Sequence, residues 1–119
     1  MSKILIVEDE KDIRAIYKKE LEYSGYEILE AQTGEEGFDV FSKENPDLVL
    51  LDITLQDSSG IDILKRIKEK DKSEKVVMIT NLDTPVIINE AYESGADGYI
   101  IKMETSLSQL VDEVKRYTK

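Results

Sequence analysis

The chain has 119 residues and a formal net charge of −10, which suits one domain with a single hydrophobic core and disfavours direct binding to nucleic acid. It contains no cysteine and no histidine, which excludes disulfides, thiolate metal sites and the usual general base and zinc ligand. Any chemistry must therefore use carboxylates, lysine or hydroxyl groups. No segment has the length of a membrane span and the N-terminus lacks the features of a signal peptide, so we expect no membrane association and a cytoplasmic location.

The first apolar run, residues 3–7, predicts a strand that is buried on both faces. Residues 12–24 follow with the spacing of an amphipathic helix, and Gly25 provides a helix stop. The apolar positions of this helix are Ile13, Tyr17 and Leu21. Residues 26–31 predict a second strand, which carries two glutamates and is less apolar than the first.

Thr33 is the predicted N-cap of a second helix, because a glutamate stands at the third helical position after it. Asn45-Pro46 ends this helix and leads into a third strand over residues 47–51. A loop over residues 56–60 then precedes a third predicted helix. The apolar positions of that helix are Ile61, Leu64 and Ile67.

The fourth strand is predicted over residues 76–79, and Thr84-Pro85 caps and starts the helix after it, with proline at the first helical position. Gly95 ends that helix before a fifth strand over residues 98–101. A last helix begins at Ser106 and is amphipathic. Its apolar face consists of Leu107, Leu110, Val111 and Val114.

Strands and helices thus alternate five times with short connections. This pattern predicts an α/β fold, a three-layer, doubly wound (βα)5 sandwich of the flavodoxin type, with a parallel five-stranded sheet in the order 2-1-3-4-5. We expect residues 1–119 to form one such domain. Ligands of open parallel sheets bind outside the carboxyl ends of the strands, where the strand order reverses. Residues that follow strands one and three should therefore meet at the binding crevice.

Three acidic residues follow these two strands: Glu8 and Asp9 after the first, and Asp52 after the third. Like charges about 4 Å apart repel by roughly 4 kcal/mol per pair at an effective dielectric constant near 20, so a proton or a cation must neutralise them. Hard oxygen ligands suit Mg²⁺, with Mn²⁺ as an alternative. A lone acidic pair more often caps a helix, but Asp52 on the adjacent strand favours a metal site.

Asp52 ends a strongly apolar strand, where a carboxylate serves no packing purpose. Carboxylates can act as nucleophiles toward phosphorus and form aspartyl phosphates. Such a transfer needs in-line positioning and positive charge on the equatorial oxygens. Lys102 after the fifth strand supplies positive charge, and Thr80 at the end of the fourth supplies a hydroxyl donor. Together these residues predict the acceptor site of a phosphoryl transfer.

Four motifs at the strand ends resemble those of the receiver domain of two-component response regulators, the CheY-like superfamily, and they cover essentially the whole chain. They are Ile4-Leu5-Ile6-Val7-Glu8-Asp9-Glu10, Leu50-Leu51-Asp52-Ile53 leading to Gly60, Met78-Ile79-Thr80, and Gly95-Ala96-Asp97-Gly98-Tyr99-Ile100-Ile101-Lys102. The resemblance implies a phosphoprotein of a phosphorelay, in which Asp52 accepts the phosphoryl group from the phosphohistidine of a sensor histidine kinase or phosphotransfer protein. It implies no enzyme activity beyond the chain's own Mg²⁺-dependent phosphorylation and slow autodephosphorylation.

The same resemblance assigns a role to each residue of the predicted site. Glu8 and Asp9 hold Mg²⁺ with Asp52, directly or through water, and Thr54 offers its backbone carbonyl to the ion. Lys102 pairs with Asp52 and afterwards with a phosphoryl oxygen.

Thr80 and Tyr99 are the switch residues that the resemblance implies. Thr80 moves toward the phosphoryl group and Tyr99 swings inward, which changes the face formed by the fourth helix, the fifth strand and the fifth helix. That face then contacts a downstream protein or a fused output domain. Some regulators dimerise there through basic residues of the fourth helix. Residues 83–94 contain no lysine or arginine, so we expect a monomer when the chain is unphosphorylated.

The chain departs from the receiver pattern at three positions. Gln56 stands four residues after Asp52, where proline is common, and Met103 replaces the proline that often follows the lysine. A cis bond before a residue other than proline costs about 2.5–4 kcal/mol, so the peptide bond before Met103 should be trans. The direction of the Lys102 side chain is then not fixed by the family pattern. Asn81 replaces a small residue, could narrow access to the phosphoryl group, and predicts slow phosphoryl loss.

Three other functions compete with a receiver. A haloacid-dehalogenase-like Mg²⁺ phosphatase needs a second acid two residues after its aspartate, where this chain has Thr54. A flavodoxin-like FMN binder needs a phosphate loop after the first strand, where the acidic residues 8–10 would repel phosphate. An interaction module that works without phosphorylation remains the main alternative, although it leaves the clustered carboxylates unexplained.

Overall fold

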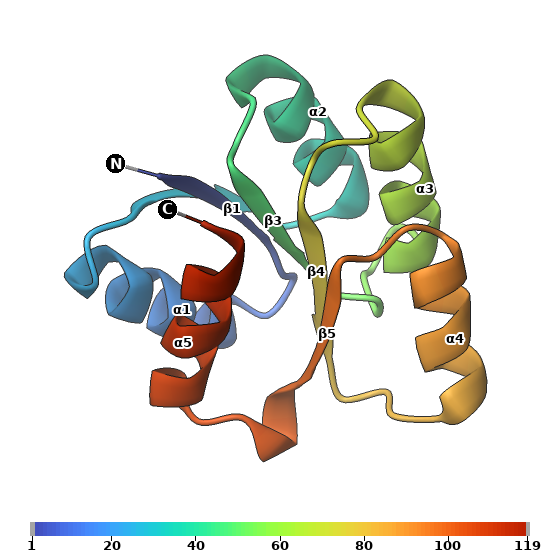
Figure 1. Ribbon diagram of the computed structural model, residues 1–119. Helices are drawn as coiled ribbons and strands as arrows, with labels where there is room; N and C mark the ends of the chain where they lie inside the picture. The colour runs from blue at the N-terminus through green and yellow to red at the C-terminus, as the bar shows by residue number, and fades with distance from the viewer. Residues whose placement is uncertain (1, 119) are drawn as a thin grey trace.

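The computed structural model describes residues 2–118, and within them five parallel strands alternate with five α-helices (Figure 1). The strands are β1 (Lys3–Val7), β2 (Glu27–Ala31), β3 (Leu48–Leu51), β4 (Val76–Thr80) and β5 (Gly98–Ile101). The helices are α1 (Lys11–Tyr23), α2 (Gly34–Glu44), α3 (Gly60–Lys70), α4 (Pro85–Glu93) and α5 (Leu107–Tyr117). A short 3-10 helix, η1 (Lys102–Glu104), joins β5 to α5.

The sheet has the order β2-β1-β3-β4-β5, which confirms the predicted doubly wound topology. The order reverses between β1 and β3, where Val7 pairs with Leu51 in a parallel register. The ladder continues one step further, because Asp52 donates its backbone N–H to the carbonyl of Val7 at 3.1 Å. The residues after β1 and β3 are thereby placed side by side.

Helices cover both faces of the sheet, with α1 and α5 on one face and α2, α3 and α4 on the other (Figure 1). Each face has its own apolar core, because the three central strands are buried on both sides. Leu21, Leu110 and Val114 pack on the first face, and Phe41, Leu64 and Ile67 pack on the second. This three-layer arrangement is the predicted one.

The predicted helix boundaries follow from local backbone chemistry. The Thr33 and Thr84 side chains accept hydrogen bonds from the N–H groups of Glu36 and Ile87, as expected of N-caps. After α1 and α4 the chain takes positive φ at Gly25 (99°) and Gly95 (108°), a conformation that side chains with a Cβ rarely adopt. Across residues 2–118, no helix is long and apolar enough to cross a membrane.

Candidate functional site

An acidic cluster lies where β1 and β3 end. The carboxylates of Glu8, Asp9 and Asp52 each place one oxygen within 4.8 Å of the others. Glu8 is fully buried, Asp52 is 4% exposed, and Asp9 is half-buried. Parallel strands bring these residues together because their carboxyl ends meet at one edge of the sheet. Three ionised carboxylates at this separation repel strongly and require positive charge between them.

Lys102 supplies part of that charge from the end of β5. Its Nζ lies 2.5 Å from Glu8 Oε1 and 2.7 Å from Asp52 Oδ2, and only 10% of its side chain is exposed. Burial by itself lowers the pKa of Lys102, but hydrogen bonds from the ammonium to Asp52 and Glu8 outweigh burial and raise that pKa above its ordinary value. Lys102 is therefore a fixed cation shared by two carboxylates.

Glu8 is held from several directions. Burial raises the pKa of its carboxyl group, and the hydrogen bonds from Lys102 and from the Glu10 backbone N–H act against that rise. The Arg14 guanidinium donates to the Glu8 carbonyl at 2.7 Å and also reaches Glu30 at 3.2 Å. Arg14 thus fixes the backbone of the acidic loop, a role that its position in α1 did not reveal in the sequence.

The two oxygens of Asp52 have different partners. Oδ2 accepts from Lys102, and Oδ1 accepts from the backbone N–H of Thr54 at 3.1 Å. The N–H bond holds the carboxylate in one orientation at the start of the β3–α3 loop. Gly60 is required below it, because a Cβ there would lie 2.0 Å from the Asp52 carbonyl oxygen.

A pocket of about 240 Å³ opens over this cluster. Its lining includes Asp9, Asp52, Thr54, Thr80, Asn81 and Lys102. The structure thus brings together at one opening the residues that the sequence singled out at the ends of β1, β3, β4 and β5, with Glu8 buried behind them. The hydroxyl of Thr80 accepts a hydrogen bond from the Leu82 N–H at 3.3 Å.

Tyr99 lies outside this pocket, at a half-buried position of β5. Its hydroxyl donates to the Leu82 carbonyl at 2.6 Å, and its ring centroid lies 6.5 Å from that of Tyr92. Leu82 is therefore bonded on one side to Thr80 and on the other to Tyr99. The two predicted switch residues are connected through the β4–α4 loop.

Comparison with known proteins shows the family to which this chain belongs. The family model of the response regulator receiver domain matches residues 4–115. The chain belongs to this family. It is 36% identical over 115 residues to the sporulation initiation phosphotransferase F of Bacillus subtilis, which covers 97% of this chain and 92% of that protein.

Two further comparisons agree with this assignment. Protein CcdB of Bacillus subtilis is 38% identical over 117 residues, covering 96% of this chain and 98% of that protein. The solved structure of a CheY-like receiver domain protein from Methanospirillum hungatei JF-1 superposes with a TM-score of 0.93 at 31% identity, covering 98% of this chain and 92% of that chain. The receiver interpretation is thus confirmed, and with it the general role of a phosphoacceptor in two-component systems. Receiver domains are generally not catalytic enzymes.

Two loop contacts of this receiver were not expected from the sequence. Asp57 accepts hydrogen bonds from the N–H groups of Gly34 and Glu35 at 2.8 and 3.0 Å, which ties the β3–α3 loop to the start of α2. Those N–H groups hold the pKa of Asp57 below its ordinary value. The amide oxygen of Asn81 accepts from the backbone N–H of Met103 at 2.8 Å. The bond before Met103 is trans, because no cis peptide bond occurs among residues 2–118.

Proposed function

We propose that residues 1–119 form one receiver domain that accepts a phosphoryl group on Asp52 from the phosphohistidine of a sensor kinase or phosphotransfer protein. The observation that carries this proposal is the position of Lys102, which bonds to Asp52 and Glu8 while Asp9 adds a third carboxylate. One ammonium cannot neutralise three carboxylates. The remaining negative charge makes the pocket a receptor for a further cation.

Mg²⁺ fits the donor set of this pocket, and Mn²⁺ is the alternative. The ligands offered are hard oxygens: the carboxylates of Glu8, Asp9 and Asp52 and the backbone carbonyl of Thr54. Asp9 and Asp52 line the pocket, whereas Glu8 is fully buried and is not part of the pocket lining. We therefore assign the larger share of ion binding to Asp9 and Asp52. When bound, the ion would supply positive charge that stabilises the negative charge of the phosphoryl group.

The chain's own residues orient the reaction. A carboxylate oxygen of Asp52 attacks phosphorus in line with the donor imidazole; a P–O bond forms while the P–N bond breaks, and the electron pair leaves with the imidazole nitrogen. Thr54 N–H holds the carboxylate in position for the attack. Lys102 then pairs with a phosphoryl oxygen, and the Thr80 hydroxyl donates to another. Water later hydrolyses the acyl phosphate slowly, because Asn81 narrows the opening through which water reaches it.

The signal leaves the pocket through the β4–α4 loop. For its hydroxyl to face the phosphoryl group, Thr80 gives up the hydrogen bond from Leu82 N–H. Tyr99 is bonded to the carbonyl of the same Leu82, so a shift of this residue frees the tyrosine to turn inward. This is a two-state element that a local charge change can bias.

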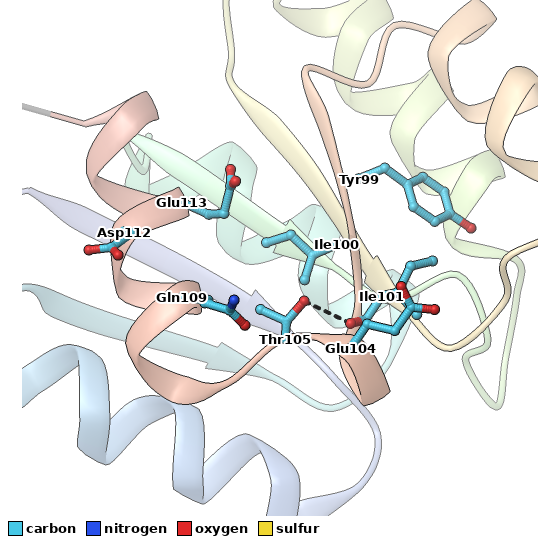
Figure 2. Close-up of a pocket in the computed structure, with 8 residues that line it drawn as sticks. All are labelled: Tyr99, Ile100, Ile101, Glu104, Thr105, Gln109, Asp112 and Glu113. Carbon is cyan, nitrogen blue, oxygen red and sulfur yellow. Dashed lines mark hydrogen bonds between the residues drawn. The ribbon is translucent and has the colours of Figure 1, made fainter.

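The face next to Tyr99 is the proposed output surface. A groove of about 450 Å³ lies between β5 and α5. Of its lining residues, Ile100 points toward α5 and Tyr99 points away from it (Figure 2). Glu104, Asp112 and Glu113 make the groove acidic, and the Thr105 hydroxyl donates a hydrogen bond to the Ile101 carbonyl at 2.8 Å (Figure 2). We infer a downstream protein or fused output domain as the partner, a monomer before phosphorylation, and a cytoplasmic location.

Mass spectrometry of the intact protein tests the proposed function. After incubation with acetyl phosphate and Mg²⁺, the wild type should gain one phosphoryl group, and omission of Mg²⁺ should prevent the gain. Asp52→Asn should gain none, because an amide is not a competent nucleophile here. A folded wild type without any adduct would favour the interaction module that works without phosphorylation.

A further inference from the structure

The strongest unassigned feature near the pocket is the hydrogen bond from Met103 N–H to the side chain of Asn81. Asn81 directly follows Thr80, and Met103 directly follows Lys102. The bond therefore joins the two positions next to two pocket residues. It lies beyond the ends of β4 and β5, where the backbone ladder has stopped.

This bond extends the β4–β5 ladder by one side-chain rung. The last backbone pair of the two strands is Thr80 with Ile101. Lys102 thus stands between two anchored neighbours: Ile101, paired in the sheet, and Met103, bonded to Asn81 at 2.8 Å. The base of the long lysine side chain is fixed on both sides, which limits the positions that its ammonium can reach.

The two residues are chemically matched to each other. A proline after Lys102 would have no N–H, so a side chain at position 81 would have nothing to accept there. Met103 has that N–H, and it lies in the first turn of η1, where N–H groups lack partners within the helix. A small residue at position 81 would offer no side-chain acceptor. Asparagine supplies one across the gap between the loops.

We propose that Asn81 is a positioning residue for Lys102: it holds Met103 N–H and thereby fixes the direction from which the ammonium approaches Asp52. This inference rests on the proposed function, since it concerns the rate at which Asp52 is phosphorylated. It assigns to Asn81 a task besides narrowing the opening of the pocket. Positioning acts on phosphoryl uptake, whereas narrowing acts on access of water during phosphoryl loss.

Three variants of Asn81 and one control variant separate the two tasks. Asn81→Leu keeps a side chain of similar size but removes the acceptor, and Asn81→Ala removes both. Met103→Ala is the matched control, because it changes a side chain that is 83% exposed and keeps the backbone N–H. Asn81→Asp retains an acceptor for the Met103 N–H and should keep part of the wild-type rate of phosphoryl uptake.

The first readout is the rate of adduct formation with acetyl phosphate at saturating Mg²⁺. Asn81→Ala and Asn81→Leu should both be slower than the wild type by about three- to tenfold, whereas Met103→Ala should be unchanged. Phosphoryl loss should accelerate in Asn81→Ala only, since leucine still narrows the opening. A wild-type rate of uptake in Asn81→Leu would overturn the proposal.

The second readout uses the unphosphorylated protein and does not depend on the proposed function. Hydrogen exchange by NMR should find the Met103 amide protected in the wild type and exchanging at least about tenfold faster in Asn81→Ala and Asn81→Leu. The ammonium signal of Lys102 should shift or broaden in the same two variants. If the wild type takes no phosphoryl group but these signals change as described, the proposed function fails and the positioning stands. Equal exchange in all variants would refute the positioning.

Discussion

The two ends of the sheet each hold a largely buried lysine among acidic groups, but their charge balance differs. At the carboxyl ends, Lys102 serves Glu8 and Asp52 while Asp9 brings a third carboxylate to the same place. At the amino ends, Lys68 Nζ lies 2.9 Å from Asp97 Oδ2, and Lys75 approaches the other Asp97 oxygen at 4.0 Å. At the carboxyl ends, three carboxylates share one ammonium. At the amino ends, the Asp97 carboxylate has two ammonium groups near it.

The amino-terminal end is a structural clamp. Lys68 also donates to the carbonyl of Glu74 at 2.5 Å, and Asp97 accepts from the Val76 N–H at 2.9 Å. These bonds tie α3 to the beginnings of β4 and β5. A groove of about 580 Å³ lies beside them, so a cavity next to a buried ion pair does not by itself mark a site of chemistry. The receiver site is distinguished by three carboxylates whose oxygens lie within 4.8 Å of one another around one ammonium, a grouping that the described residues form only there.

Replacement of each lysine should affect a different property, the phosphorylation rate for Lys102 and the unfolding free energy for Lys68. Lys102→Met should slow phosphorylation by acetyl phosphate about 100-fold, because a donor to the developing phosphoryl charge is lost. Lys68→Met should phosphorylate at the wild-type rate but lose about 1–3 kcal/mol of unfolding free energy, because Asp97 is left without its closest cation. Time courses of adduct mass and urea unfolding measure the two effects. An equal loss of rate in both variants would contradict the distinction between the two ends.

Glu74 provides a pH test of the amino-terminal end. Burial raises the pKa of this carboxyl group to about 7, and the charges of Asp71 and Asp47 add to the rise. The folded state therefore keeps a proton that the unfolded state releases, so unfolding free energy should fall as pH rises from about 4.5 to 7 and remain low above that. Glu74→Gln should remove this dependence and raise stability at pH 8 by up to about 3 kcal/mol.

Urea unfolding of the wild type and Glu74→Gln at pH 5 and pH 8 measures this effect. Glu69→Gln, at an exposed position of α3, serves as the control and should retain the wild-type dependence. The same pH dependence in Glu74→Gln and the wild type would mean that another group carries it.

Mg²⁺ should stabilise the folded protein by binding at the carboxyl-terminal end of the sheet and not at the amino-terminal end. At a free concentration ten times its dissociation constant, an ion that binds only the folded state raises unfolding free energy by about 1.4 kcal/mol. Asp9→Asn should lose most of this gain, whereas Asp71→Asn, at the opposite end, should keep it. Thermal unfolding with and without Mg²⁺ provides the comparison. An equal response of both variants would place the ion elsewhere.

The fold was largely predictable because its signals are local. Apolar runs, capping threonines and the glycines after α1 and α4 each act within a few residues, and the crossover rule then sets the strand order. The meeting of Asp9, Asp52 and Lys102 at one pocket was also predictable, since parallel strands end at one edge. Their proposed roles as metal ligand, phosphoacceptor and cation remain predictions.

The contacts that escaped prediction join residues from different loops. Asn81 and Met103 meet only because β4 and β5 end at the same level, and neither position alone indicates a hydrogen bond. Burial of Glu74 depends on how the loop after α3 folds back against the sheet, which periodicity does not encode. The family resemblance likewise implied a pairing of Lys102 with Asp52, but it gave no sign that Glu8 would share the ammonium.

The most direct test of the central claim is to locate the phosphoryl group. The phosphorylated wild type should be treated with borohydride, which reduces an acyl phosphate to the alcohol, and then digested and mapped by mass spectrometry. We predict that Asp52 alone is converted to homoserine, because it is the carboxylate that both Lys102 and Thr54 orient. Conversion at Asp9 or at any other acid, with Asp52 unchanged, would contradict this account of the site.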